Sequence, residues 1–144
     1  MTDICQSLRG RYFAVPVAPQ VERRRILVYR VDDGTQVPFS ITVEKNGSED
    51  PNYGRLRWTP GGNAIAFTAT GPDRRSGVFV QDFVPGQDTS ATRRRLAGSV
   101  PGMLTESFTI ARDSSSMVLS MVELRSDLLL AHGIPNLVPP GRVK

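Results

Sequence analysis

The sequence predicts an all-β protein made of short antiparallel strands, and three observations support this prediction. Thirteen glycines and eleven prolines interrupt the 144 residues so often that few stretches can hold a helix of several turns. Short apolar runs lie between clusters of Gly, Pro, Asp and Ser, which is typical of strands separated by turns. The third observation is an internal repeat with a period of 52 residues, which indicates a series of similar supersecondary units.

The repeat becomes visible when short segments are aligned. Each of three segments begins at a turn and continues into an apolar strand, and their first residues, 10, 62 and 114, are 52 residues apart. Two further apolar segments, 26–29 and 78–81, have the same separation, and the corresponding run 128–131 lies two residues early. The alignment predicts a single domain of three units, at about 1–46, 53–99 and 104–138, with a tail at 139–144.

The first unit supplies three expected strands, at about 11–17, 25–31 and 37–43. Between the second and third, residues 32–35 form a hairpin turn whose Asp-Asp-Gly-Thr sequence tolerates positive φ. The opening strand of this unit is expected to be missing.

The middle unit is expected to be complete. A tight turn at 59–62 and a loop at 71–76 separate its first three strands, and a short fourth strand follows. The expected strands are 53–58, 64–70, 78–83 and 93–97. Together they predict a four-stranded antiparallel meander.

The last unit supplies strands at about 107–111, 117–123 and 127–132, and its closing strand is expected to be missing. One alternative stays open here. Met117, Met121, Leu124 and Leu128 also have helical spacing, with Ser114 as a possible N-cap, so residues 117–131 form either strand, turn and strand or a helix. The repeat favours the strands, because the equivalent segments of the other units are not helix-like.

A stretch of the middle unit resembles a known repeat signature. Residues 58–67, Trp-Thr-Pro-Gly-Gly-Asn-Ala-Ile-Ala-Phe, are similar to the Trp-Ser-Pro-Asp-Gly-Lys-x-Leu-Ala-Phe signature of TolB-like, WD-repeat-like bacterial β-propellers. Arg94-Arg95-Leu96 stands where those units often carry an Arg-x-Leu-Thr strand that closes the blade, and Ser126-Asp127-Leu128-Leu129-Leu130 resembles their Ser-Asp-Ile-x-x outer hairpin. Gly61 replaces the aspartate of the signature, whereas the last unit keeps Asp113 but lacks the Trp, Pro and Gly.

The resemblance implies a partial β-propeller of about three antiparallel four-stranded blades, with the first and last incomplete. In such blades the signature residues are structural, and here they are Trp58, Pro60, Gly62, Asp113 and Asp127. Because propellers have about four to eight blades, three cannot close a ring. The chain is therefore expected to be the C-terminal part of a larger propeller, completed by the remaining blades, or to self-associate through its exposed sheet edges.

The residues that usually carry enzyme chemistry are scarce. Cys5 is the only cysteine and His132 the only histidine, so no cysteine zinc site can form, and we expect neither a metal nor a cofactor. No Gly-x-Ser-x-Gly elbow is present, since Gly98-Ser99-Val100-Pro101-Gly102 has the wrong spacing. The sequence therefore predicts a protein that is not an enzyme.

Arginine dominates the charge of the chain. The formal net charge is +4, and Lys45 and Lys144 are the only lysines among 18 basic residues. Three basic clusters, at 23–25, 74–75 and 93–95, could contact phosphates, but no recognition helix or aromatic-interleaved surface accompanies them, and acidic residues lie close by. We therefore expect a protein partner rather than nucleic acid.

Propeller geometry favours ligand binding on the innermost strands and the loops around the channel, which makes Arg55, Arg57 and Glu106 the candidate binding residues. The resemblance implies a non-enzymatic module for protein binding or sensing, such as the sensor region of a bacterial Ser/Thr kinase. The alternatives are an accessory, substrate-gating propeller of a prolyl-oligopeptidase-type serine peptidase, or a truncated reading frame without function.

No apolar run is long enough to span a membrane, and no signal core follows Met1. A cytoplasmic location is the default expectation, and a periplasmic one stays open if the chain is a fragment.

Overall fold

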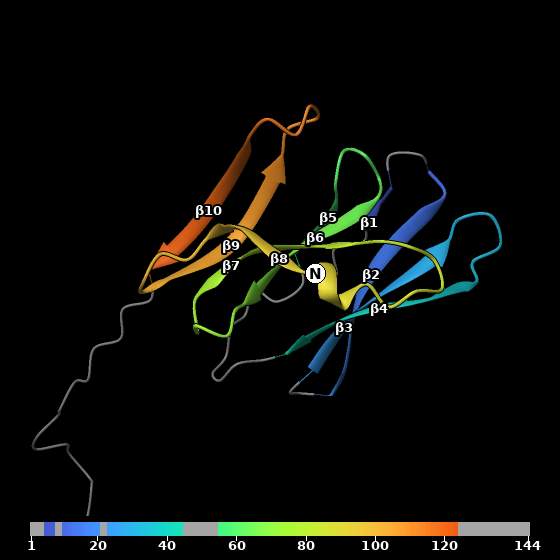
Figure 1. The fold of residues 1–144 in the computed structure, drawn as a ribbon, viewed down its shortest axis with the longest axis horizontal. Helices are drawn as coiled ribbons and strands as arrows, with labels where there is room; N and C mark the ends of the chain where they lie inside the picture. Colours follow the sequence, from blue (N-terminus) through green and yellow to red (C-terminus); the bar gives the residue numbers. More distant parts are fainter. Residues whose placement is uncertain (1–4, 8–9, 21–22, 45–54, 124–144) are drawn as a thin grey trace, which may run out of the picture.

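The computed structural model describes residues 5–7, 10–20, 23–44 and 55–123. Within these ranges every sheet is antiparallel, and the only helical element is a single 3-10 turn, η1 (Ser90–Thr92). The strands form three sheets that follow one another in chain order (Figure 1). The all-β, antiparallel prediction is confirmed.

The first sheet has four strands in the order β1 (Cys5–Gln6), β2 (Tyr12–Gln20), β3 (Arg23–Arg30) and β4 (Gln36–Glu44). The hairpin turn between β3 and β4 forms as expected. The Asp33 carboxylate accepts hydrogen bonds from the Thr35 amide and hydroxyl, at 2.9 and 2.7 Å, and Gly34 adopts a φ of 68°. These two hydrogen bonds stabilise the turn that places β4 beside β3.

The expectation that the first unit lacks an opening strand is wrong. β1 pairs with β2 through Cys5↔Ala14 and Gln6↔Phe13. The strand has two residues, which is too short for an alternating pattern to reveal it in the sequence.

The second sheet is the predicted four-stranded antiparallel meander. Its order is β5 (Leu56–Trp58), β6 (Ala64–Thr70), β7 (Ser76–Asp82) and β8 (Arg94–Gly98). Most residues of β6 and β7 are buried, and the apolar runs 64–67 and 78–80 within them do not alternate with polar residues, as expected for strands that are covered on both faces. This sheet is therefore the centre of the described structure.

The third sheet is a hairpin of β9 (Met103–Ile110) and β10 (Met117–Glu123). The helix alternative is wrong for residues 117–123, because burial in β10 alternates with a period of two: Met117 and Leu119 are half-buried, while Val118 is 68% exposed. The expected strand at 127–132, including Asp127, lies outside the described residues.

The 52-residue repeat is present in the backbone. The amides of Ser7, Thr59 and Ala111 donate to the carbonyls of Tyr12, Ala64 and Ser116, at 2.8, 3.0 and 2.9 Å. In the same three hairpins Gly10, Gly62 and Ser114 have φ values of 65, 68 and 61°. Strands β1, β5 and β9 are thus equivalent, and so are β2, β6 and β10.

Aromatic side chains hold the first and second sheets together. The Phe83 ring, just after β7, lies 5.0 Å from the Tyr12 ring of β2, 4.9 Å from the Phe39 ring of β4 and 5.0 Å from the Trp58 ring of β5. Phe83, Phe39 and Trp58 are all less than a tenth exposed. Edge-to-face contacts of this kind add to the apolar burial, so this cluster joins the two sheets.

Candidate functional site

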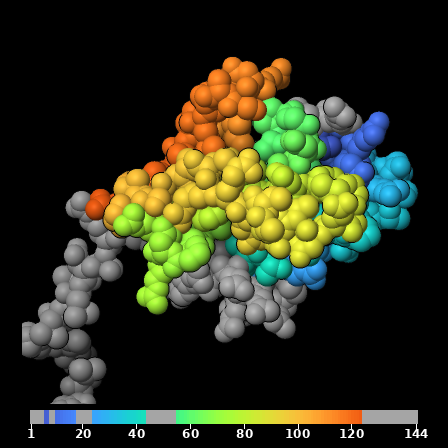
Figure 2. Space-filling model, viewed as in Figure 1, coloured from blue at the N-terminus to red at the C-terminus, as the bar shows by residue number. Residues whose placement is uncertain are grey.

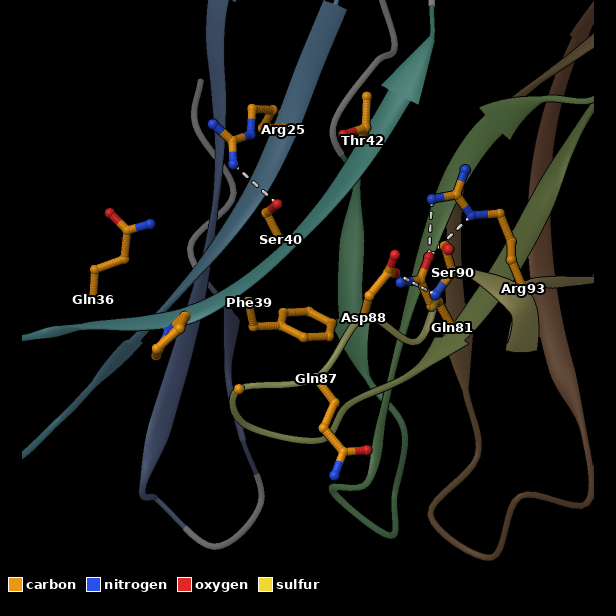
Figure 3. A pocket seen from close by; sticks show the side chains of 12 residues that line it. Arg25, Gln36, Phe39, Ser40, Thr42, Gln81, Gln87, Asp88, Ser90 and Arg93 are labelled. Carbon is orange, nitrogen blue, oxygen red and sulfur yellow. Dashed lines mark hydrogen bonds between the residues drawn. The ribbon is translucent and has the colours of Figure 1, made fainter.

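An open cleft of about 630 Å³ lies between the first sheet and the segment that links β7 to β8. Figure 2 shows this segment, in yellow, lying against the cyan and teal first sheet. The residues that line the cleft are mainly polar (Figure 3): Arg25, Gln36, Pro38, Phe39, Ser40, Thr42, Gln81, Gly86, Gln87, Asp88, Ser90 and Arg93. The cleft is therefore built from two repeat units.

The alternation of β4 produces one wall of the cleft. Val37, Phe39 and Ile41 are buried in the core, so the residues between and after them face outward. Ser40 and Thr42 are two of these outward residues, and Arg25 pairs with Thr42 in the β3–β4 register. The Arg25 Nη2 donates to Ser40 Oγ at 3.0 Å, which holds the guanidinium against this wall.

A buried glutamine organises the opposite wall. Gln81 of β7 is 1% exposed, and its Oε1 accepts hydrogen bonds from Nε and Nη2 of Arg93, at 3.0 and 2.9 Å. Its Nε2 donates to Thr89 Oγ1 at 3.2 Å, and the Thr89 hydroxyl in turn donates to the Asp82 carbonyl. The guanidinium carbon of Arg93 also lies 5.4 Å from the centre of the Phe67 ring. Arg93 is thus held in place by a polar network and an aromatic ring.

One carboxylate is among the described residues that line the cleft. Asp88 accepts a hydrogen bond from the Ser90 amide at 2.9 Å, and its pKa is lowered by the hydrogen bonds from Ser90. Asp88 is therefore ionised at neutral pH and engaged with its own loop. The described part of the lining therefore holds two arginines against one carboxylate, and this positive balance favours anionic groups.

A second cavity of about 400 Å³ adjoins the cleft, because both are lined by Thr42, Ser90 and Arg93. Its other lining residues are more apolar: Val43, Ala69, Thr70, Gly71, Pro72 and Phe79. The two cavities form one groove, with a charged part around Arg25, an apolar part around Phe79 and Arg93 between them. We call this the inter-sheet groove.

The binding residues predicted from the sequence do not line this groove. Arg55 precedes β5 and is half-buried, and its carbonyl accepts from the Thr68 amide at 3.0 Å. Arg57, exposed on β5, donates from Nη1 to the Leu56 carbonyl at 2.9 Å. Glu106 lies on β9 and accepts from Ser120 Oγ at 3.0 Å. Their role in binding stays a prediction.

The signature residues lie in equivalent hairpins. Trp58 is 6% exposed and packs against Phe83, while Pro60 and Gly62 lie in the turn between β5 and β6. In the turn between β9 and β10, the Asp113 carboxylate accepts from the Ser115 amide at 3.0 Å and hydroxyl at 2.7 Å. These hydrogen bonds hold the pKa of Asp113 below its usual range.

Comparison with known proteins gives a structural neighbour and no sequence relative. No protein-family model matches the chain, and no curated protein matches it. Among solved structures, Pyrococcus horikoshii acylaminoacyl peptidase superposes with a TM-score of 0.54 at 14% sequence identity, covering 94% of this chain. The likeness is one of fold. This chain spans 20% of the length of that protein, which contains a β-propeller domain.

Two absences hold for the part of the chain that the structure describes. No three His, Cys, Asp or Glu side chains are grouped as ligands for a metal ion there. In the same ranges, no helix is long and apolar enough to cross a membrane.

Sequence reasoning missed the groove residues Arg25, Gln81 and Arg93. The available signal was the pair of arginine clusters at 23–25 and 93–95, which are suited to contacts with anionic groups. Each cluster contributes one arginine to the groove. Which arginine of each cluster faces the groove depends on strand register and on the loop after β7, and the sequence composition predicts neither.

A second arginine network closes the edge of the second sheet. Arg95 of β8 donates from Nη1 and Nη2 to the two carboxylate oxygens of Asp73, at 2.8 and 2.6 Å, and lies 5.0 Å from the centre of the Phe79 ring. The Arg95 hydrogen bonds are the largest cause of the lowered pKa of Asp73, which lies well below its usual range. The pair ties β8 to the loop between β6 and β7.

This pair predicts acid-sensitive stability. Because folding lowers the pKa of Asp73, its contribution is present above the unfolded-state pKa of about 3.9 and is lost as the pH falls toward the folded-state value. We expect Asp73→Asn to lower the melting temperature at pH 7 and to reduce its fall between pH 5 and pH 2. Thermal unfolding followed by circular dichroism at each pH measures both effects. Equal pH slopes for the two proteins would contradict the assignment.

Proposed function

We propose that this chain is a non-enzymatic, protein-binding module of the TolB-like β-propeller type. Each four-stranded meander is then one blade, and β9 and β10 begin a third, within units 1–46, 53–99 and 104–138. The observation that carries the proposal is the recurrence of the same hairpin hydrogen bonds at 52-residue intervals. Stacked blades require such identical, repeated hairpins.

The likeness to a protein that contains a β-propeller domain supports the assignment of the sheets as blades. The inter-sheet groove supports a role in binding. The described residues that line it include no histidine or cysteine, the side chains that most often serve as general base or thiol nucleophile, whereas its arginines and amides are suited to hydrogen bonding with a polypeptide.

Peptide binding tests this proposal. The fluorescently labelled 144-residue chain is applied to an array of octapeptides that covers acidic, basic, apolar and neutral polar compositions. We expect saturable binding to a subset of the peptides, confirmed by titration in solution. Failure of every peptide to bind at millimolar concentration would overturn the protein-binding function.

The absence of catalysis is tested separately. We expect the chain to release no p-nitroaniline from N-acetyl-alanine p-nitroanilide, a chromogenic acylated substrate. Release that scales with protein concentration, and that a serine-directed inhibitor stops, would contradict the proposal that the module is non-enzymatic.

The peptidase-gating propeller is the second candidate, and the superposition on an acylaminoacyl peptidase favours it. The intact mass of the native gene product separates the two. A product well above 15.8 kDa that carries an α/β-hydrolase domain would support gating. A product whose remaining sequence supplies only further blades, or a kinase domain, would support the binding module.

A further inference from the structure

We propose that the inter-sheet groove binds an extended peptide segment that places a carboxylate between Arg25 and Arg93 and an apolar side chain against Phe79. This inference deepens the proposed protein-binding function and rests on it. It names the surface and the chemistry of the ligand.

The carboxylate is the group that the charged part of the groove fits. Figure 3 shows Arg25 beside Ser40 on one side of the cleft and Arg93 beside Gln81 on the other side. Each guanidinium is oriented by a neutral side-chain oxygen, Ser40 Oγ for Arg25 and Gln81 Oε1 for Arg93, and Arg93 also interacts electrostatically with the Asp88 carboxylate. The described lining still places two arginines against this one carboxylate. An oriented guanidinium is preorganised for a carboxylate, because less side-chain entropy is lost on binding.

The apolar side chain follows from the other part of the groove. Beyond Arg93 the lining changes to Val43, Ala69, Pro72 and Phe79, so the polarity reverses along the groove. In an extended peptide, side chains two residues apart point the same way, which lets an acidic and an apolar side chain enter the two parts together. A mixed groove of this kind discriminates against nucleic acid, which offers phosphate but no aliphatic side chain.

The edge of the first sheet supplies the backbone contacts. β4 is the last strand of its sheet, and Ser40 and Thr42 of β4 line the groove. An edge strand presents backbone groups that an extended peptide can pair with. Pro38 removes one of these donors, which limits the pairing to the stretch beside Ser40 and Thr42.

The test uses a fluorescein-labelled octapeptide of serine and threonine with one glutamate and a leucine two positions later, titrated by fluorescence anisotropy into the whole chain. Removing one charge-assisted contact weakens binding about tenfold. We therefore expect about tenfold weaker binding for Arg25→Gln, for Arg93→Gln and for a peptide with glutamine in place of glutamate. A peptide with serine in place of leucine should also bind more weakly.

Arg94→Gln is the matched control. Arg94 is adjacent in sequence to Arg93, but it lies 3.9 Å from Asp82 with its side chain 62% exposed, and it lines a different cavity. It should bind the peptide as the parent chain does. Circular dichroism and thermal unfolding check that Arg93→Gln still folds, and Arg25→Gln gives an independent readout because Arg25 is exposed.

Three results would overturn the inference. If array peptides bind but Arg25→Gln, Arg93→Gln and Arg94→Gln bind them equally, the protein-binding function stands and the groove is not its site. If the glutamine peptide binds as tightly as the glutamate peptide, the carboxylate is not recognised. If an oligothymidylate binds in preference to every peptide and competes with them, the groove is a nucleic-acid site.

Discussion

Phe83→Ala should lower the free energy of unfolding by about 3–5 kcal/mol, which is the usual loss for removing a buried phenylalanine. Phe83 is 8% exposed, and its ring is in edge-to-face contact with Tyr12, Phe39 and Trp58. The three partners come from β2, β4 and β5, so one substitution removes contacts across both sheets. The cavity left behind lies where the sheets meet, and neither sheet can close it alone.

Urea denaturation measures this loss. Trp58 is the only tryptophan, and its ring lies 5.0 Å from that of Phe83, so its fluorescence reports on this junction directly. Val84→Ala is the control, because Val84 is the next residue and is 38% exposed, and it should change stability by less than about 0.5 kcal/mol. If Phe83→Ala were no more destabilised than this control, the aromatic cluster would not join the sheets.

The repeat explains why much of the fold could be predicted. Two expected strands, 64–70 and 117–123, have the bounds of β6 and β10, because each begins directly after a repeated turn and contains an apolar run. In β10 the repeat overruled a helical spacing that was equally visible in the sequence. The prediction failed for β1, whose two residues are strand only because β2 lies beside them.

Burial was harder to predict than strands, because it depends on the neighbouring unit. Phe83 and Val31 occupy the same place in the repeat: their amides donate to the carbonyls of Asn63 and Arg11, at 2.8 and 3.0 Å. Yet Phe83 is 8% exposed and Val31 is 44% exposed. The first sheet packs over Phe83, and nothing in the described residues packs to the same degree over Val31. A repeat predicts local geometry, whereas packing follows from which units are adjacent.

The groove was beyond sequence reasoning for the same reason. Arg25 and Arg93 belong to different units and occupy different places in the repeat, so no alignment of the units brings them together. The resemblance directed attention to the innermost strands and therefore to Arg55, Arg57 and Glu106. The burial of Gln81 could not be predicted from the sequence, because glutamine is usually exposed. It becomes evident only in the structure, where the side-chain amide of Gln81 is hydrogen-bonded to Thr89 and Arg93.

Gly98→Ala should destabilise the chain by about 2–5 kcal/mol, because it combines a conformational strain of about 1–2 kcal/mol with overpacking of about 1–3 kcal/mol. Gly98 has a φ of 95°, and a Cβ there would lie 2.6 Å from the Gly77 Cα and 3.0 Å from the Ser76 carbonyl oxygen. Both obstacles are backbone atoms of β7, which is held between β6 and β8. Neither atom can move without breaking backbone hydrogen bonds between β7 and its neighbouring strands.

The damage should reach the third sheet as well. Ser76 Oγ accepts a hydrogen bond from the Thr105 amide at 2.9 Å, and this bond links the start of β7 to β9. If the added Cβ in Gly98→Ala displaces β7, Ser76 moves with it, and the hydrogen bond between the second and third sheets is weakened. Hydrogen exchange should show faster exchange of the Thr105 amide in the variant than in the parent chain.

Gly102→Ala separates the two causes. Gly102 has a φ of 74°, and a Cβ there would meet no atom within 4 Å, so this variant carries the strain without the clash. We expect it to lose only about 1–2 kcal/mol and to leave the Thr105 amide protected. The difference between the two variants in urea denaturation then measures the close approach of β7 and β8. Equal losses in the free energy of unfolding would mean that the backbone at Gly77 moves to make room for the added Cβ. The second sheet would then not be the rigid centre of the described structure.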